Sequence, residues 1–149
     1  ILTGETLPTG ASGGITRLGF IASVAGAAFI AIVSSVGVLL SAATQSMPAS
    51  GLVPVVFFAI GIAAIVTVSG FLGSVIDSML GASLQAEYIC SVSGKHTERP
   101  RTGNSPNTLI KGYRRITNDT VNLLSVSAAA ATGLLLAAVL PLPSIPALL

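Results

Sequence analysis

The sequence predicts an all-α integral membrane protein with about three transmembrane helices. Of its 149 residues, 52% are hydrophobic and 8% are charged, whereas soluble domains carry about 25% charged residues. Residues 18–43, 51–76 and 120–149 contain no Asp, Glu, Lys or Arg. Each stretch exceeds the roughly 20 residues that cross about 30 Å of hydrocarbon. Because so few charges cannot cover an aqueous surface, composition excludes a soluble globular domain.

The first predicted span covers residues 18–43. Small residues such as Gly26 and Gly37 stand among its large apolar residues, a mixture that lets membrane helices approach closely. A short uncharged segment follows at 44–50, where Pro48 suits a tight turn. We therefore expect this turn to connect two antiparallel spans.

The second predicted span covers residues 51–76 within an apolar run that is too long for one crossing. Residues 51–84 would reach about 50 Å as a straight helix at 1.5 Å per residue. We expect a helix that is tilted, kinked or broken, with Gly70 and Gly73 as the expected places. Residues 77–88 either continue this helix or form a re-entrant helix after it. The third predicted span, 120–140, stops at a run of prolines, and the whole of 1–149 forms a single membrane domain.

A basic polar loop is predicted over residues 89–118. Apart from Arg17, every Lys and Arg lies in this loop, so the positive-inside rule orients it toward the cytosol or its equivalent. With three crossings, Arg17 falls on the same side. The basic residues thus report topology, and nucleic acid is not an expected partner. The loop is rich in Ser, Thr, Pro and Gly, which predicts partial disorder over 91–107 and a solvated His96.

Asp77 is a carboxylate in an apolar setting, where a charge costs about 2.5 to 3.5 kcal/mol at the centre of a spanning helix. In a helix it shares a face with Ser74, Ser78, Gly81 and Gln85. Two interpretations stay open. The face lines a cavity where Asp77 holds a cation or a metal-bound phosphate, or Asp77 is a buried carboxylate hydrogen-bonded to neighbouring helices.

Polar residues also open the third span. Asn118 is a candidate N-cap, with Asp119 in the first turn, where the helix dipole favours a negative charge. Asp119 and Asn122 share a helix face, and two oxygen ligands at a membrane interface suit a hard cation such as Mg²⁺. The capping and metal-binding interpretations are compatible.

A glycine-dense segment, TGASGGIT at residues 9–16, leads into the first span. Backbone N–H groups of such a loop at a helix start can bind phosphate oxygens. The segment lacks the GK[ST] ending of a P-loop. On spacing alone, a plain flexible turn is therefore the favoured interpretation of this segment.

Three blocks carry a resemblance to a known family. They are LPTGASGGITRLGFIASVAG (Leu7–Gly26), GFLGSVIDSMLGASLQ (Gly70–Gln85) and ITNDTVNLLS (Ile116–Ser125). In this order and spacing they resemble the C-terminal half of the transmembrane protein nineteen family, which also contains the plant and cyanobacterial phytyl phosphate kinase of tocopherol synthesis. Members carry further N-terminal spans with an acidic motif, so we expect an N-terminal half of the same protein as a partner, together with membrane lipid.

The resemblance implies transfer of a phosphoryl group from a nucleotide, CTP in the photosynthetic branch, to a prenyl monophosphate such as phytyl phosphate. It implies an endomembrane or organelle membrane, and magnesium with a nucleoside triphosphate as cofactor. Asp77 and Asp119 are the expected magnesium ligands, and Asn122 is expected to orient a phosphate. The expected phosphate- and nucleotide-binding residues are Gly13, Gly14, Thr16, Ser78, Arg114 and Arg115.

Two functions of other classes remain as alternatives. A membrane transporter would use Asp77 as a coupling-ion site in a broken helix. A non-enzymatic membrane assembly component would use the small-residue helix faces to pack on partner helices.

Overall fold

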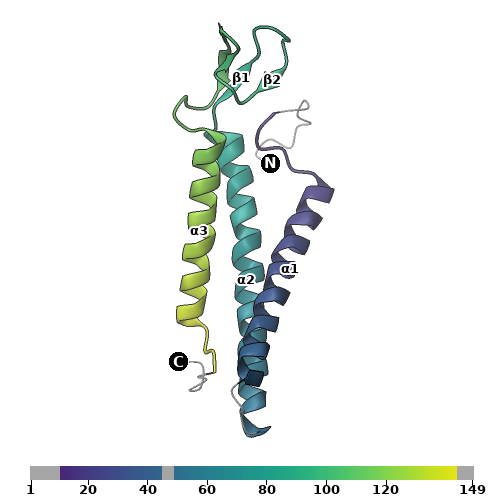
Figure 1. The fold of residues 1–149 in the computed structure, drawn as a ribbon. Helices are drawn as coiled ribbons and strands as arrows, with labels where there is room; N and C mark the ends of the chain where they lie inside the picture. Colours follow the sequence, from purple (N-terminus) through teal and green to yellow (C-terminus); the bar gives the residue numbers. More distant parts are fainter. Residues whose placement is uncertain (1–10, 45–48, 144–149) are drawn as a thin grey trace. The chain divides into compact units, whose positions relative to one another are not determined.

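The computed structural model describes residues 11–44 and 49–143. Within them lie three long helices, α1 (Arg17–Thr44), α2 (Ala49–Ser83) and α3 (Asn118–Val139) (Figure 1). Each is long and apolar enough to cross a membrane. The predicted fold class, a mostly helical integral membrane protein with three spans, is confirmed. The predicted turn over 44–50 and its Pro48 fall largely outside the described residues.

The surfaces of the helices are those of lipid-exposed spans. At most 17% of the most apolar window of any of the three helices is buried within the described part of the chain. Large side chains such as Phe29 and Leu134 are 64% and 75% exposed. Soluble proteins rarely expose contiguous apolar surface of this extent, so hydrocarbon has to cover it.

Helix α2 continues past residue 76, which is one of the two arrangements expected for the residues that follow the second span. Its 35 residues run without interruption through Gly70 and Gly73, because an isolated glycine costs a helix only about 1 kcal/mol relative to alanine. Residues 77–83 continue the same helix. No re-entrant helix over 77–88 is seen, since the chain leaves α2 after Ser83 and enters a β-strand at Glu87.

The described residues form two compact units. One contains residues 11–19 and 73–128, and the other contains 20–44, 49–72 and 129–143. The first unit therefore holds the start of α1, the end of α2, the start of α3 and the whole of the basic loop.

In the second unit, small residues let α1 and α2 pack closely. Ser35 of α1 donates a hydrogen bond across to the carbonyl oxygen of Ala59 at 3.1 Å. A methyl group added at Gly70 would lie 3.3 Å from the Ala27 side chain, closer than ordinary contact. This packing is the kind that the small residues of the first span predict.

The loop between α2 and α3 is folded, so the expected disorder over 91–107 is wrong. Strands β1 (Glu87–Ile89), β2 (His96–Thr97) and β5 (Thr108–Lys111) form an antiparallel sheet in the order β2-β1-β5, and β3 (Arg101–Thr102) pairs with β4 (Ser105–Pro106). The loop composition suggested disorder because it does not reveal contacts between residues distant in sequence.

Buried Asn107 shows what holds the loop together. Its side-chain nitrogen donates to the Arg99 carbonyl and to Thr102 Oγ1, both at 2.9 Å. Its side-chain oxygen accepts the backbone N–H of Ser91 at 3.0 Å. One amide thus replaces the backbone partners that a longer sheet would supply.

Gly112, the residue after β5, lies against the backbone just past the end of α2, where a side chain cannot fit. Its φ is +71°, and an added Cβ would lie 2.0 Å from the Gln85 carbonyl oxygen. We predict that Gly112→Ala lowers stability by about 2–4 kcal/mol, from backbone strain and steric overlap together. Thermal unfolding of the detergent-solubilised protein measures the change.

Gly94→Ala is the matched control, because Gly94 has φ +67° but no atom within 4 Å of an added Cβ. It should show only the strain, about 1 kcal/mol. Equal losses in the two variants would contradict the predicted overlap at Gly112.

Candidate functional site

Parts of all three sequence blocks that carry the resemblance meet in one compact unit. Residues 11–19, 73–85 and 116–125, which belong to the three blocks in turn, all lie in the first unit. Residues 20–72 separate the first two of these segments in sequence. The fold therefore gathers the polar residues of the blocks at the ends of the three helices.

Asp77 lies at the contact between α2 and α3. Ser125 donates its hydroxyl hydrogen bond to Asp77 Oδ1 at 3.1 Å and also lies 3.0 Å from the Asn122 carbonyl oxygen. Ser125 is 5% exposed, whereas Asp77 is half-buried. Asp77 thus has a hydrogen-bond partner on the neighbouring helix, as the structural interpretation requires, and this partner, Ser125, lies one turn from Asn122.

The sequence did not lead us to predict Ser125 as a partner of Asp77. It stands three residues after Asn122, and this i, i+3 spacing places both residues on one helix face. Continuing the Asp119–Asn122 face by one more turn would have found it.

The polar face at the C-terminal end of α2 is partly or fully buried. Ser74, Asp77 and Ser78 are half-buried, and Gly81 and Gln85 are buried. Ser78 donates to the Ser74 carbonyl oxygen at 3.1 Å. Ser78 is thus satisfied within its own helix, and its predicted role toward a nucleotide would need that bond to be exchanged.

The glycine loop lies directly against the last turn of α2. Gly13 has φ +80°, and an added Cβ would lie 2.2 Å from the backbone nitrogen of Ala82. From the other side, a Cβ added at Gly81 would lie 3.3 Å from the Gly13 nitrogen. Only glycine permits this approach. The loop is docked, which contradicts a plain flexible turn.

The start of α1 is capped within the same loop. Thr16 Oγ1 accepts the backbone N–H of Gly19 at 2.9 Å, the geometry of an N-cap. Gly14 and Thr16 are exposed. The positive end of α1 therefore lies beside an exposed glycine, a combination that suits an anion.

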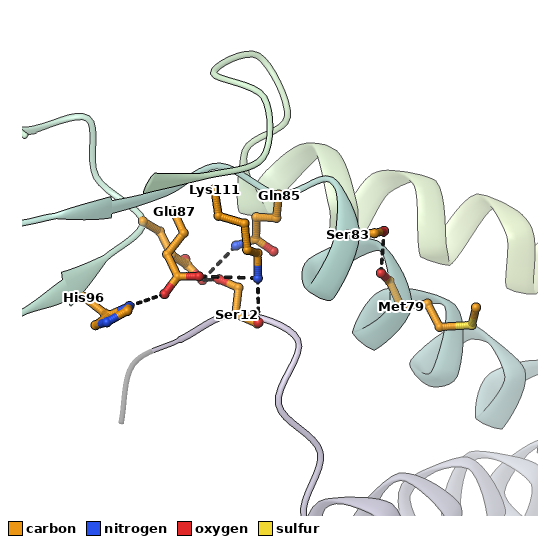
Figure 2. A network of polar contacts seen from close by, with 8 residues as sticks. Ser12, Met79, Ser83, Gln85, Glu87, His96 and Lys111 are labelled. Carbon is orange, nitrogen blue, oxygen red and sulfur yellow. Dashed lines mark hydrogen bonds and ion pairs between the residues drawn. The ribbon is translucent and has the colours of Figure 1, made fainter. Parts of the chain in front are cut away.

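A buried carboxylate, Glu87, organises the polar contacts beyond the glycine loop (Figure 2). Glu87 is 3% exposed. His96 Nδ1 donates to Glu87 Oε1, and Lys111 Nζ lies 3.4 Å from Glu87 Oε2. The expectation of a solvated His96 is wrong, because a buried carboxylate requires partners and His96 is one of them.

Ser12 connects the glycine loop to the folded basic loop at two atoms. Lys111 Nζ donates to the Ser12 carbonyl oxygen at 3.1 Å, and the Ser12 hydroxyl donates to Glu98 Oε1 at 3.2 Å. The same Glu98 oxygen accepts from Gln85 Nε2 at 2.8 Å. Sequence reasoning missed this network, and the only signal for it was a charge, Glu87, between apolar neighbours.

The remaining predicted residues lie at the start of α3 and just before it. Asp119, Asn122, Arg114 and Arg115 are all exposed, with Asp119 in the first turn. The expected N-cap at Asn118 is wrong by one residue, since Thr117 Oγ1 accepts the Thr120 N–H at 3.4 Å.

No cluster of three or more His, Cys, Asp and Glu residues that could hold a metal occurs among residues 11–44 and 49–143. Magnesium nevertheless binds through one or two carboxylates, with substrate phosphates and water completing its shell. Asp119 stands six residues before Ser125, the partner of Asp77, about 9 Å along the axis at 1.5 Å per residue. The donor chemistry fits magnesium, and the spacing fits a metal-bound phosphate chain better than one ion held by both carboxylates.

Cys90 is a buried thiol on the folded loop, 8% exposed. Hydrogen bonds from Ser93 and, second, from Thr102 lower the pKa of Cys90 from 9.0 to about 6. Its sulfur lies 3.3 Å from Thr102 Oγ1. These hydrogen bonds favour the thiolate form of Cys90.

Comparison with known proteins gives one family. The family model described as integral membrane protein DUF92 matches residues 1–130. Neither a curated protein nor a solved structure gives a significant match.

We predict that Ser125→Ala destabilises the protein by about 1–3 kcal/mol, because it removes the donor that a half-buried carboxylate uses. Thermal unfolding in detergent measures the loss. Ser127→Ala is the matched control, since Ser127 donates only to the Leu123 carbonyl of its own helix at 2.7 Å. A Ser125→Ala variant as stable as Ser127→Ala would rule out a significant contribution from the Asp77–Ser125 bond.

We also predict that thiolate absorbance of Cys90 titrates near pH 6 in the folded protein. Ser93→Ala should raise this pKa more than Thr102→Val does, because the Ser93 bond is the larger cause. Since the folded pKa lies below the ordinary one, the associated stability is complete above pH 9.0 and is lost as the pH falls through about 6. A midpoint near the ordinary value would disprove the thiolate.

Proposed function

Since the chain belongs to the DUF92 family of integral membrane proteins, we propose that it transfers a phosphoryl group from a nucleoside triphosphate to a prenyl monophosphate such as phytyl phosphate. The observation that carries the proposal is that one unit contains residues 11–19, 73–85 and 116–125, which belong to the three sequence blocks. The resemblance of these blocks to the family with phytyl phosphate kinase supports it.

Phosphoryl transfer asks a protein mainly for positioning and for neutralisation of charge. Gly13 and Gly14, with the capped start of α1 at Thr16, supply backbone dipoles for a phosphate. Exposed Arg114 and Arg115 supply positive charge just before α3. The apolar spans offer the hydrocarbon setting that a prenyl chain requires.

Asp77 and Asp119 would hold magnesium, which neutralises phosphate charge when it is bound. Asp77 acts from the α2–α3 contact, and Asn122, one turn from Ser125, orients a phosphate oxygen. Asp119, exposed in the first turn of α3, reaches the part of the phosphate chain nearer the aqueous side.

The folded basic loop is assigned to the cytosolic or equivalent side of an endomembrane or organelle membrane. Positive charge near span ends favours that side, and nucleoside triphosphates are available there. The chemistry thus takes place at the membrane face where the water-soluble donor and the lipid acceptor can meet.

The two alternative functions have less support. The transporter interpretation relied on a broken helix at Asp77, whereas α2 is continuous there. The assembly interpretation relied on small-residue faces seeking partner helices, but Ser35 and Gly70 pack within the chain itself.

The test uses the full-length protein in detergent with radiolabelled CTP or ATP, magnesium and a panel of prenyl monophosphates. Thin-layer chromatography should show label in a prenyl diphosphate. Asp77→Asn should lower turnover at least about a hundredfold, while the amide oxygen still accepts the Ser125 hydrogen bond and preserves the fold. Asp119→Asn should also lose activity, and Ser127→Ala should retain it.

Absence of transfer with every nucleotide and acceptor would overturn the proposal, and substrate flux across vesicles without nucleotide would favour a transporter. Unchanged turnover in Asp77→Asn would remove Asp77 from the site.

A further inference from the structure

We infer that the folded loop between α2 and α3 is a clamp that positions the glycine loop, with Lys111 and Glu98 as its positioning residues. As a mechanism for ordering a phosphate site, this inference rests on the proposed function. The clamp itself stands on contacts that are independent of any activity. The sequence suggested for this basic loop only a role in orientation.

The clamp forms hydrogen bonds with both the backbone and the side chain of Ser12. Lys111 Nζ donates to the Ser12 carbonyl oxygen at 3.1 Å, and Ser12 Oγ donates to Glu98 Oε1 at 3.2 Å. Ser12 is 8% exposed. Two bonds in different directions fix the orientation of the peptide unit that joins Ser12 to Gly13.

Both positioning residues, Lys111 and Glu98, have further partners that fix their side chains. Lys111, in β5, pairs with buried Glu87 in β1, which His96 in β2 also binds. Figure 2 shows Ser12 beside Lys111 and Gln85. Glu98 is held by Gln85, just past the end of α2, at 2.8 Å. The sheet and the end of α2 thus support the clamp from two sides.

The fixed orientation matters because Gly13 has no freedom to shift. Gly13 needs φ +80° and contact with Ala82, whose backbone nitrogen would lie 2.2 Å from an added Cβ. The clamp on Ser12 and the contact at Gly13 together place exposed Gly14 and the start of α1. In an enzyme, such ordering before binding lowers the entropic cost of holding phosphate.

The experiment follows the glycine loop directly in the full-length protein. A spin label is attached at Ile15→Cys, an exposed position, in a Cys90→Ser background, and its mobility is measured by electron paramagnetic resonance. Lys111→Met should raise mobility, and Lys111→Arg should restore the parent spectrum. Lys95→Met is the matched control, because Lys95 lies on the same loop with an exposed side chain.

A second variant covers the case in which Lys111→Met disrupts the sheet. Glu98 is exposed, so Glu98→Ala removes the Ser12 and Gln85 bonds without leaving a buried charge behind. It should also raise label mobility, and Glu98→Gln, which keeps an acceptor oxygen, should not. Unchanged mobility in both Lys111→Met and Glu98→Ala would overturn the clamp.

Kinetics test the connection to the phosphate site. Lys111→Met should raise the KM for the nucleotide about tenfold, the size expected for a bond to a charged group, with little change in kcat. A fall in kcat at constant KM would indicate loss of folded protein and would refute positioning. If the parent protein shows no transfer, the proposed function fails, and label mobility alone decides whether the clamp exists.

Discussion

Water is absent from the interior of a bilayer, and this absence dictates where the polar side chains of the spans find partners. Ser34, Thr67 and Ser69 solve the problem within one helix, by donating to the carbonyl oxygen four residues earlier at 2.7–2.9 Å. A carboxylate has no proton to donate, so Asp77 needs a donor from elsewhere and takes it from Ser125. The requirement brings α2 and α3 together at that position.

The two units differ in their content of charged residues. From Arg17 onward, every Asp, Glu, Lys and Arg of the sequence lies in the first unit. The second unit packs by small residues, as Gly70 does against Ala27, and meets lipid with large apolar ones. The charged residues and the small-residue packing therefore belong to different units.

Sequence reasoning succeeded where the physics is local. Span number follows from the length and hydropathy of each run, because the bilayer acts on every residue of a run alike. For Asp77 the sequence left two interpretations open, a ligand-binding cavity and a hydrogen bond to a neighbouring helix. It did not identify Ser125 as the partner. The contact of Lys111 with Ser12 joins residues 99 positions apart. No periodicity or composition encodes such a pairing, so the folding of the basic loop and its hold on the glycine loop needed the structure.

The length of α2 creates a hydrophobic mismatch. The helix over Gly51–Ser83 is long and apolar enough to cross a membrane, yet at 1.5 Å per residue it measures about 50 Å against about 30 Å of hydrocarbon. Even at a tilt of 40°, the upper end of the usual range, about 26 residues suffice to cross. Counted from Gly51, the crossing is complete close to Asp77. The last two turns of α2 therefore exceed the length that the hydrocarbon requires, and Asp77 stands at the start of this excess.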